Sequence, residues 1–280
     1  MRAGPSFTPR LALLVPAMVL GFSSAAAQQP PPTPQPAEKQ AAAPVDQTLE
    51  RVRNCSVEER DINADCRAQV AQQPAGKTPK AAAPVDLTGT WASIVTEDWR
   101  WRVMTPPKGD YASLPLNPEG KRVADTWDPA DRSNGCKVYG AAGLLRNPTR
   151  VRLSWADEST LKLETDHGVQ TRQFRFGSAA PGGGTATLQG DSVAAWDHSG
   201  LKVVTTSLSP GYLRKNGVPY SDKTVLTEFY NRYSAFGADW LLVTTVVVDP
   251  TYLSREFITS SHFKRLPDDS GWHPVPCTTS

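Results

Sequence analysis

The chain has 280 residues, and its 30 lysines and arginines nearly balance its 28 aspartates and glutamates, for a formal net charge of +2 at pH 7. This balance excludes a broad positive surface of the kind that binds nucleic acid or anionic lipid. No apolar run reaches the roughly 20 residues that a membrane-spanning helix needs. The sequence therefore predicts no nucleic-acid partner and no membrane insertion.

The first 27 residues have the three parts of a secretory signal peptide. Arg2 and Arg10 give a positive start, residues 11–22 form an apolar run, and small residues at 23–27 offer a cleavage site of the A-x-A type. Pro16 interrupts the apolar run, which is too short to span a bilayer. We therefore expect a signal peptide over residues 1–27 and a periplasmic or secreted mature protein.

Residues 28–84 are expected to form a linker. The stretch 28–47 is rich in Pro, Ala and Gln and cannot bury enough apolar surface to fold, so it predicts a disordered N-terminal arm. The charged stretch 48–72 has weak helical spacing and fits one or two short helices. The string AAAPVD occurs at 41–46 and again at 81–86, and nothing similar follows the two copies, so we interpret it as a duplicated linker.

The four cysteines are Cys55, Cys66, Cys136 and Cys277. An even number in an exported chain predicts two disulfides. Because Cys55 and Cys66 lie close together in the linker, we expect the pairs Cys55–Cys66 and Cys136–Cys277, one of three possible pairings. The sequence has no C-x-x-C or H-x-x-H spacing of the kind that typifies metal sites. We expect neither a metal nor a cofactor.

Residues 85–280 are expected to form one β domain, because short alternating runs of β-branched and aromatic residues are separated by turn residues. The ten expected strands are 89–95, 99–104, 151–155, 161–165, 169–176, 187–196, 201–208, 225–232, 240–248 and 257–264. Several of the connections are short and rich in Asp, Gly and Ser, which predicts that successive strands are antiparallel neighbours.

One helix interrupts this pattern. Asn117 and Pro118 offer an N-cap and a proline at the first helical position, leading into residues 120–127. With some ten strands and a single short helix, we expect an all-β fold: an antiparallel meander closed into a barrel, which removes exposed sheet edges.

The first expected strand opens with Gly89-Thr90-Trp91, a G-x-W motif that resembles the opening of lipocalin-like barrels, where the tryptophan plugs the closed end. Longer strings, at 96–111, 136–143, 201–221 and 259–277, resemble an uncharacterised family of exported bacterial proteins to which we attach no activity. The lipocalin-like resemblance implies a barrel that binds small apolar ligands, and a few such proteins act as isomerases or hydratases. Fold alone does not fix function.

The expected second strand places its tryptophans and its charged residues on opposite faces, because side chains alternate along a strand. Trp99 and Trp101 share one face, and Asp98, Arg100 and Arg102 share the other. In one interpretation the two guanidinium groups, balanced by the aspartate, hold a carboxylate, sulfate or phosphate. In the other, which half-exposed strands favour, the tryptophans fill the core and the arginines are solvated.

Two loops with rigid turn residues follow expected strands. The first, residues 105–111, presents Lys108, Asp110 and Tyr111, and the second, residues 210–221, presents Tyr212, Arg214, Lys215, Asn216 and Tyr220. Loops on a stiff scaffold often carry binding groups, and two loops at the same barrel end would frame the mouth of a cavity. The alternative is a pair of ordinary hairpin loops.

Two charged residues, Arg172 and Glu228, fall among apolar neighbours on the inward faces of their expected strands. A buried charge is costly unless it is paired or bound to a ligand. We therefore hypothesise an Arg172–Glu228 pair inside the barrel, and a purely structural salt bridge is the favoured explanation.

These observations predict a protein that binds a small, partly apolar molecule with an anionic or polar head inside the barrel. The candidate ligand-binding residues are Trp91, Trp99, Trp101, Arg100, Arg102, Lys108, Tyr111, Arg172 and Tyr212. One alternative is a barrel enzyme of isomerase, hydratase or hydrolase type, independent of metal and nucleotide. In it, Glu228 or Asp98 acts as acid and base together with Tyr111 or His262. Another is an envelope protein that presents its loops to a partner.

Overall fold

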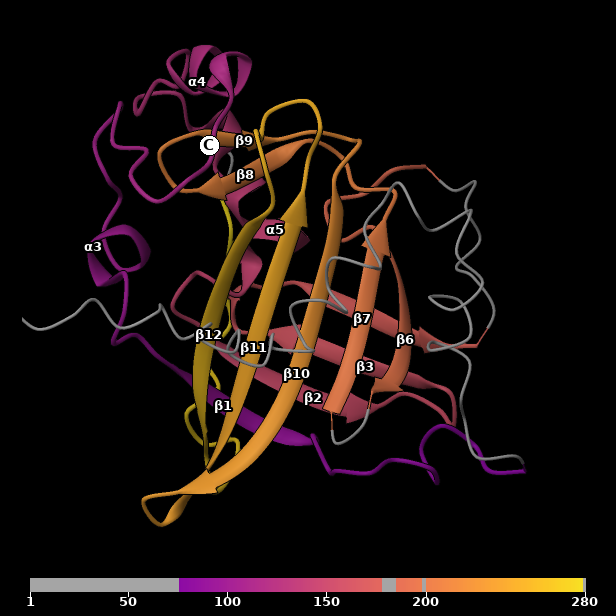
Figure 1. Cartoon of the computed structure of the whole chain (residues 1–280). Coiled ribbons are helices and arrows are strands. Elements are labelled where there is room, and N and C mark those ends of the chain that lie inside the picture. The colour runs from indigo at the N-terminus through magenta and orange to yellow at the C-terminus, as the bar shows by residue number, and fades with distance from the viewer. Residues whose placement is uncertain (1–75, 178–184, 198–199, 279–280) are drawn as a thin grey trace, which may run out of the picture. The chain divides into compact units, whose positions relative to one another are not determined.

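The computed structural model describes residues 76–177, 185–197 and 200–278. Among these residues, nine strands close into a barrel in the order β1-β12-β11-β10-β7-β6-β5-β3-β2 (Figure 1). They are β1 (Gly89–Ile94), β2 (Arg150–Trp155), β3 (Thr160–Thr165), β5 (Thr171–Phe176), β6 (Asp191–Asp197), β7 (Gly200–Thr206), β10 (Val225–Ala235), β11 (Ala238–Val248) and β12 (Phe257–Arg265). The expected all-β barrel is confirmed. The expected signal peptide, most of the linker and the Cys55–Cys66 pair lie outside the described residues.

The pairing of successive strands differs from the prediction at one place. All neighbours in the barrel are antiparallel except β5 and β6, which run parallel with Phe174 opposite Ser192. The prediction of antiparallel neighbours throughout was therefore wrong at this pair. The connection between these strands spans residues 177–190, and a parallel pair needs a connection of this length because the chain must return to the starting end.

Strand alternation sets the interior of the barrel. In β5 the residues alternate strictly between exposed and buried, with Arg172, Phe174 and Phe176 turned inward. Trp91 in β1 is fully buried in the same core, where its indole N–H donates to the Leu87 carbonyl oxygen at 3.1 Å. Many inward residues of the strands thus form one apolar cluster, and a second cluster includes Leu226, Val247 and Phe257.

The expected helix is confirmed as α4 (Pro118–Ala124), which ends three residues earlier than predicted. The Asn117 side chain caps it by accepting a hydrogen bond from the Gly120 N–H at 2.8 Å. Further short elements were not predicted, because three or four residues are too few to show a helical period. They are α3 (Trp99–Arg102), η1 (Arg132–Asn134), η2 (Lys137–Tyr139), α5 (Ala141–Leu144) and the hairpin of β8 (Gly211–Arg214) and β9 (Val218–Tyr220). Figure 1 shows α4 and the β8–β9 hairpin together at one end of the barrel.

The prediction of a strand at residues 99–104 was wrong, because these residues begin with the helix α3. Asp98 has a left-handed backbone (φ 56°), which turns the chain out of the extended conformation of β1. The Arg102 N–H then donates to the Asp98 carbonyl at 3.0 Å, as in a helical turn. Trp99 is 58% exposed and Arg102 is buried. The expected division into a buried tryptophan face and a face of solvated arginines is therefore absent from this segment.

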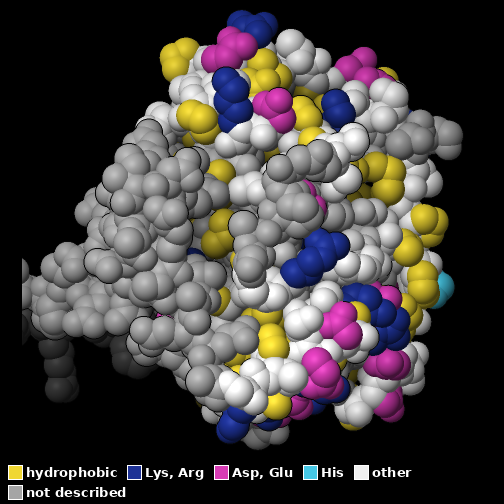
Figure 2. Space-filling view, turned by 90° about the vertical axis from the view of Figure 1, so that its right-hand side faces the viewer, with side chains coloured by type: hydrophobic (Ala, Val, Ile, Leu, Met, Phe, Trp, Pro, Cys, Tyr) yellow, Lys and Arg dark blue, Asp and Glu magenta, His cyan; other side chains and the backbone are white. Residues whose placement is uncertain are grey.

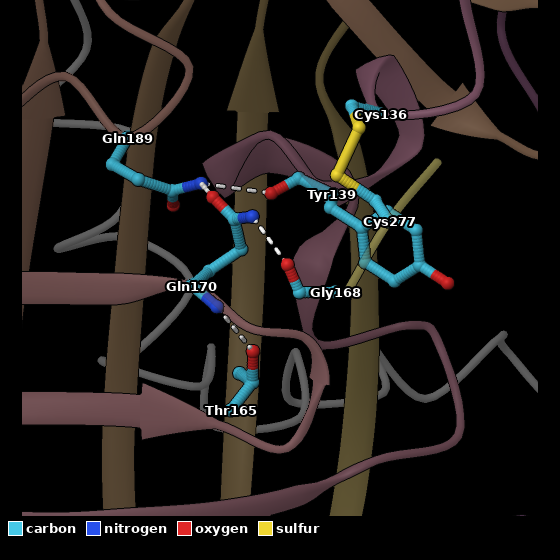
Figure 3. The surroundings of a disulfide bond; sticks show 7 residues. All are labelled: Cys136, Tyr139, Thr165, Gly168, Gln170, Gln189 and Cys277. Carbon is cyan, nitrogen blue, oxygen red and sulfur yellow. Dashed lines mark hydrogen bonds between the residues drawn. A yellow bond between two sulfur atoms is a disulfide. The ribbon is translucent and has the colours of Figure 1, made fainter. Parts of the chain in front are cut away.

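The predicted Cys136–Cys277 disulfide is confirmed (Figure 3). It joins the residue before η2 to the C-terminal tail, whose strand β13 (Val275–Pro276) pairs with β4 (His167–Gly168). Figure 3 also shows a chain of hydrogen bonds beside it, in which the Gln189 amide donates to the Tyr139 carbonyl and to the Gln170 side chain, each at 2.8 Å. The disulfide and the pairing of β13 with β4 fix the C-terminal tail to the rest of the chain.

No helix within the described ranges has the length and apolar character needed to cross a membrane. On the face shown in Figure 2, acidic and basic side chains are intermixed. Surface ion pairs such as Arg152–Glu164 and Lys162–Glu164 have the same mixed character. The charges that Figure 2 shows therefore form no extended field of one sign.

Candidate functional site

The barrel core is filled by side chains. Seven inward residues, each 0% exposed, are Leu163, Phe174, Val203, Tyr230, Leu241, Val243 and Phe263. A side chain that lined a void large enough for water would retain accessible surface. The interior around these residues therefore has no room for a ligand.

The interior does contain the predicted ion pair between Arg172 and Glu228, which is confirmed. The guanidinium donates twice to the carboxylate, with Nη1–Oε1 at 3.0 Å and Nη2–Oε2 at 2.7 Å. Nη2 also donates to the Thr205 hydroxyl at 3.0 Å. Burial alone would lower the pKa of Arg172, but the Glu228 carboxylate outweighs this effect and raises the pKa. The pair joins β5 to β10, which are not neighbours in the barrel.

A pocket of about 390 Å³ lies between the segment that follows α4 and the β8–β9 hairpin. We call it the end pocket. Its aromatic walls include Trp127, Tyr212 and Tyr252, with Tyr220 also lining it. Pockets of several hundred cubic ångströms with aromatic walls and a few polar groups are typical of small-molecule sites.

Two glycines in the hairpin let the aromatic rings approach closely. Gly217 has a φ of +79°, and a Cβ atom there would lie 2.3 Å from Cβ and Cγ of Trp127. A Cβ atom at Gly211 would lie 2.5 Å from Cζ of Tyr220. Only glycine fits at either position, so the hairpin backbone itself sets where Trp127 and Tyr220 stand in the pocket wall.

The polar lining of the end pocket includes Asp128, Asp131, Asn134 and Lys137. Asp131 accepts hydrogen bonds from the side chain and backbone of Ser133 and from Asn134, and these bonds lower its pKa. It is therefore ionised at neutral pH. The Lys137 ammonium lies 5.6 Å from the centroid of the Tyr212 ring, a cation–π distance. Two carboxylates thus face the pocket with one ammonium group.

The two predicted loops lie together, but their polar groups bind each other. Arg214 donates to the carbonyl oxygens of Asp110 and Ala112, at 3.2 and 2.9 Å. Asn216 donates to the carbonyls of Pro107 and Asp110, both at 3.0 Å. These cationic and amide side chains hold the first loop in place, and they are not presented at an open cavity mouth.

The arginines of α3 point to different surroundings. Arg102 is buried, and its Nε donates to the Arg146 carbonyl at 3.0 Å. Arg100 is exposed and pairs with Asp110 at 2.7 Å. Trp101 lies under both Arg100 and Arg214, with each guanidinium 5.0 Å from its ring. The two guanidinium groups that sequence reasoning placed on one face therefore do not share an anion site.

The four candidate acid and base residues each have another partner. Asp98 pairs with Arg146 at 3.1 Å, and the His262 ring lies 3.2 Å from the Glu97 carboxylate. The Tyr111 hydroxyl donates to Asp125 at 2.6 Å. Burial, together with this bond, raises the pKa of Tyr111 to about 12. Glu228 is held by Arg172. Neither Glu228 nor Asp98 is therefore paired with Tyr111 or His262, as the enzyme alternative requires.

Of the predicted ligand-binding residues, only Tyr212 lines the end pocket. Trp91 and Arg172 are buried in the core, whereas Trp99 and Lys108 lie on the surface. Sequence reasoning missed the other main lining residues, which are Trp127, Tyr252, Asp128, Asp131 and Lys137. Trp127, Asp128, Asp131 and Lys137 lie in one stretch of the sequence that has no helical or strand period, and Tyr252 comes from a distant segment, so no sequence pattern joined them. The one local signal was Trp127, an aromatic residue just after the expected helix.

Comparisons with models of known families, with curated proteins and with solved structures found no match to this chain.

Proposed function

We propose that this protein binds a small, partly apolar molecule in the end pocket. The observation that carries the proposal is the contrast between two parts of the molecule. The barrel core is closed by packed side chains, whereas the end pocket offers about 390 Å³ between aromatic walls. Ligand sites are concave and combine apolar or aromatic walls with polar groups, and the end pocket has such a mixed lining whereas the core has no open space.

The lining also indicates the chemistry of the ligand. A flat apolar or aromatic body would stack on Trp127, Tyr212 and Tyr252, and its polar part would face the carboxylates of Asp128 and Asp131. Two carboxylates against the single ammonium of Lys137 favour a neutral or positively charged polar part over an anionic one. Burial raises the pKa of Tyr212, so its phenol stays protonated and can donate a hydrogen bond.

We place this activity outside the cytoplasm. The Cys136–Cys277 disulfide supports this location, because disulfides persist mainly in oxidising compartments. The leader-like pattern of residues 1–27 in the sequence also supports export.

The test uses saturation-transfer difference NMR with a library of small aromatic amines, phenols and carboxylic acids. Hits are expected among the amines and phenols. Gly217→Ala should weaken their binding by about two- to tenfold, because it displaces Trp127 and a lost stacking contact costs about 0.5–1.5 kcal/mol.

Gly109→Ala is the matched control. Gly109 also has a positive φ, of +87°, but a Cβ atom there would meet nothing within 4 Å. Both variants therefore carry backbone strain, and only the first alters the pocket. Hits whose affinity is the same in both variants, or a library without hits, would refute the proposal.

A further inference from the structure

The tip of the β10–β11 hairpin carries an unusual residue. Phe236 stands in the two-residue turn between Ala235 and Ala238, and its side chain is 97% exposed. Figure 1 shows this hairpin reaching beyond the other strands at the end of the barrel opposite α4. A fully exposed phenylalanine at a projecting point buries nothing within its own chain.

The backbone at the tip makes the residue still less expected. Phe236 and Gly237 both have left-handed backbones, with φ of 53° and 68°. A turn of this kind favours Asn-Gly or Asp-Gly, because asparagine and aspartate tolerate the left-handed region and a bulky ring does not. Neither the turn nor the core requires a phenylalanine here, which points to a contact outside the chain.

The hairpin combines an uncharged tip with aromatic and paired charged residues behind it. Residues 234–238, Ser-Ala-Phe-Gly-Ala, carry no charge. Directly behind them Tyr233 and Trp240 stack with their ring centroids 6.5 Å apart. Arg232 lies behind the stacked rings, whereas its ion-pair partner Asp239 lies in front of them, opposite Ser234. Lys264 is opposite Trp240 in the sheet. An apolar tip backed by a Tyr/Trp pair, with the nearby Asp239 carboxylate neutralised by Arg232, suits a membrane interface.

The size of the tip also favours lipid over a protein partner. A stable protein interface buries about 800 Å² on each side with close shape complementarity, and one ring flanked by small residues does not offer that. A fluid bilayer needs no complementary shape. We propose that the hairpin tip inserts Phe236 into the interfacial region of a phospholipid bilayer, which holds the barrel at a membrane surface without spanning it.

The test compares flotation of the expected mature chain, residues 28–280, and of its variants with vesicles of phosphatidylcholine alone, and with vesicles that also contain phosphatidylglycerol. Phe236→Asn should lower the partition coefficient roughly ten- to hundredfold, the factor expected from burying one phenylalanine side chain. Asparagine suits the turn, so this variant should unfold at the same temperature as the wild type or higher. Binding should persist without phosphatidylglycerol, because the tip itself is uncharged.

Val169→Ser is the matched control. Val169 is 49% exposed and has a φ of 50°, in another turn that contains a glycine. The Val169→Ser substitution should leave the partition coefficient between water and vesicles unchanged. Phe236→Trp supplies a direct readout, because brominated lipid should quench this variant more strongly than the wild type.

Three results would each overturn the proposal. They are equal flotation of Phe236→Asn and wild type, no added quenching in Phe236→Trp, and binding only to vesicles that contain phosphatidylglycerol.

Discussion

The buried ion pair between Arg172 and Glu228 provides the sharpest test of how this barrel is held together. Both side chains are at most 1% exposed, and three hydrogen bonds of 2.7–3.0 Å join the guanidinium to Glu228 and Thr205. Glu228→Gln removes the negative charge and leaves Arg172 charged in the core. Breaking a buried pair from one side costs about 3–5 kcal/mol. For a domain of this size, that corresponds to a fall in melting temperature of roughly 6–20 °C.

The assay is urea unfolding followed by circular dichroism, with thermal unfolding as a second measure. The decisive comparison is with the double variant Arg172→Met, Glu228→Leu, which removes both charges and keeps apolar volume beside Phe174. Apolar replacements of a buried pair are often neutral or stabilising. The Thr205 hydroxyl keeps its 2.8 Å bond to Ser192. We expect this double variant to lie within about 2 kcal/mol of the wild type.

Equal stability of Glu228→Gln and wild type would refute this reasoning, because it would mean that the carboxylate does not compensate the buried guanidinium. A double variant less stable than Glu228→Gln would refute it as well. That result would show that the strands need the specific geometry of the pair and not merely the absence of an unpaired charge.

Two further predictions concern the elements around the barrel. Cys136→Ala together with Cys277→Ala should lower the free energy of unfolding by about 2–5 kcal/mol, because the disulfide closes a loop of sequence separation 141. Urea unfolding measures the change, and an unchanged stability would contradict the prediction. Burial alone would raise the pKa of Asp166, but hydrogen bonds from the Arg150 backbone and from Thr149 outweigh it and lower the pKa. The stabilisation by this carboxylate is therefore present above the unfolded value of about 4 and is lost as pH falls through the lower folded value. Asp166→Asn should lower stability by about 1–3 kcal/mol at neutral pH, and the difference should shrink in acid; a pH-independent difference in urea unfolding would contradict the assignment.

The barrel itself could be predicted because its signal is periodic. Alternation along β5 placed Arg172 inward with Phe174, and alternation along β10 placed Glu228 inward, so the pair followed from two independent strands. The Asn117 cap of α4 is likewise a local signal. The prediction of a strand at residues 99–104 failed, because alternating aromatic and charged residues over so few positions fit a helical turn equally well. The left-handed backbone of Asp98 decides between the two structures. The sequence does not reveal this conformation, because an aspartate and not a glycine stands at the position.

The location of the proposed binding site could not be predicted, because the sequence suggested a hollow barrel and strand number alone does not decide whether a barrel of this kind is hollow. A small barrel is either filled by side chains or holds one small ligand, and here Leu, Val, Phe and Tyr at the inward positions, with a bidentate ion pair among them, fill the interior. Such a core leaves no space, so the ligand site that we propose needs room at an end of the barrel. The end pocket meets this need through Gly217, whose missing side chain lets Trp127 pack against the hairpin. That contact joins two segments far apart in the chain, which is why a fold predicted correctly from alternation still located its cavity in the wrong place.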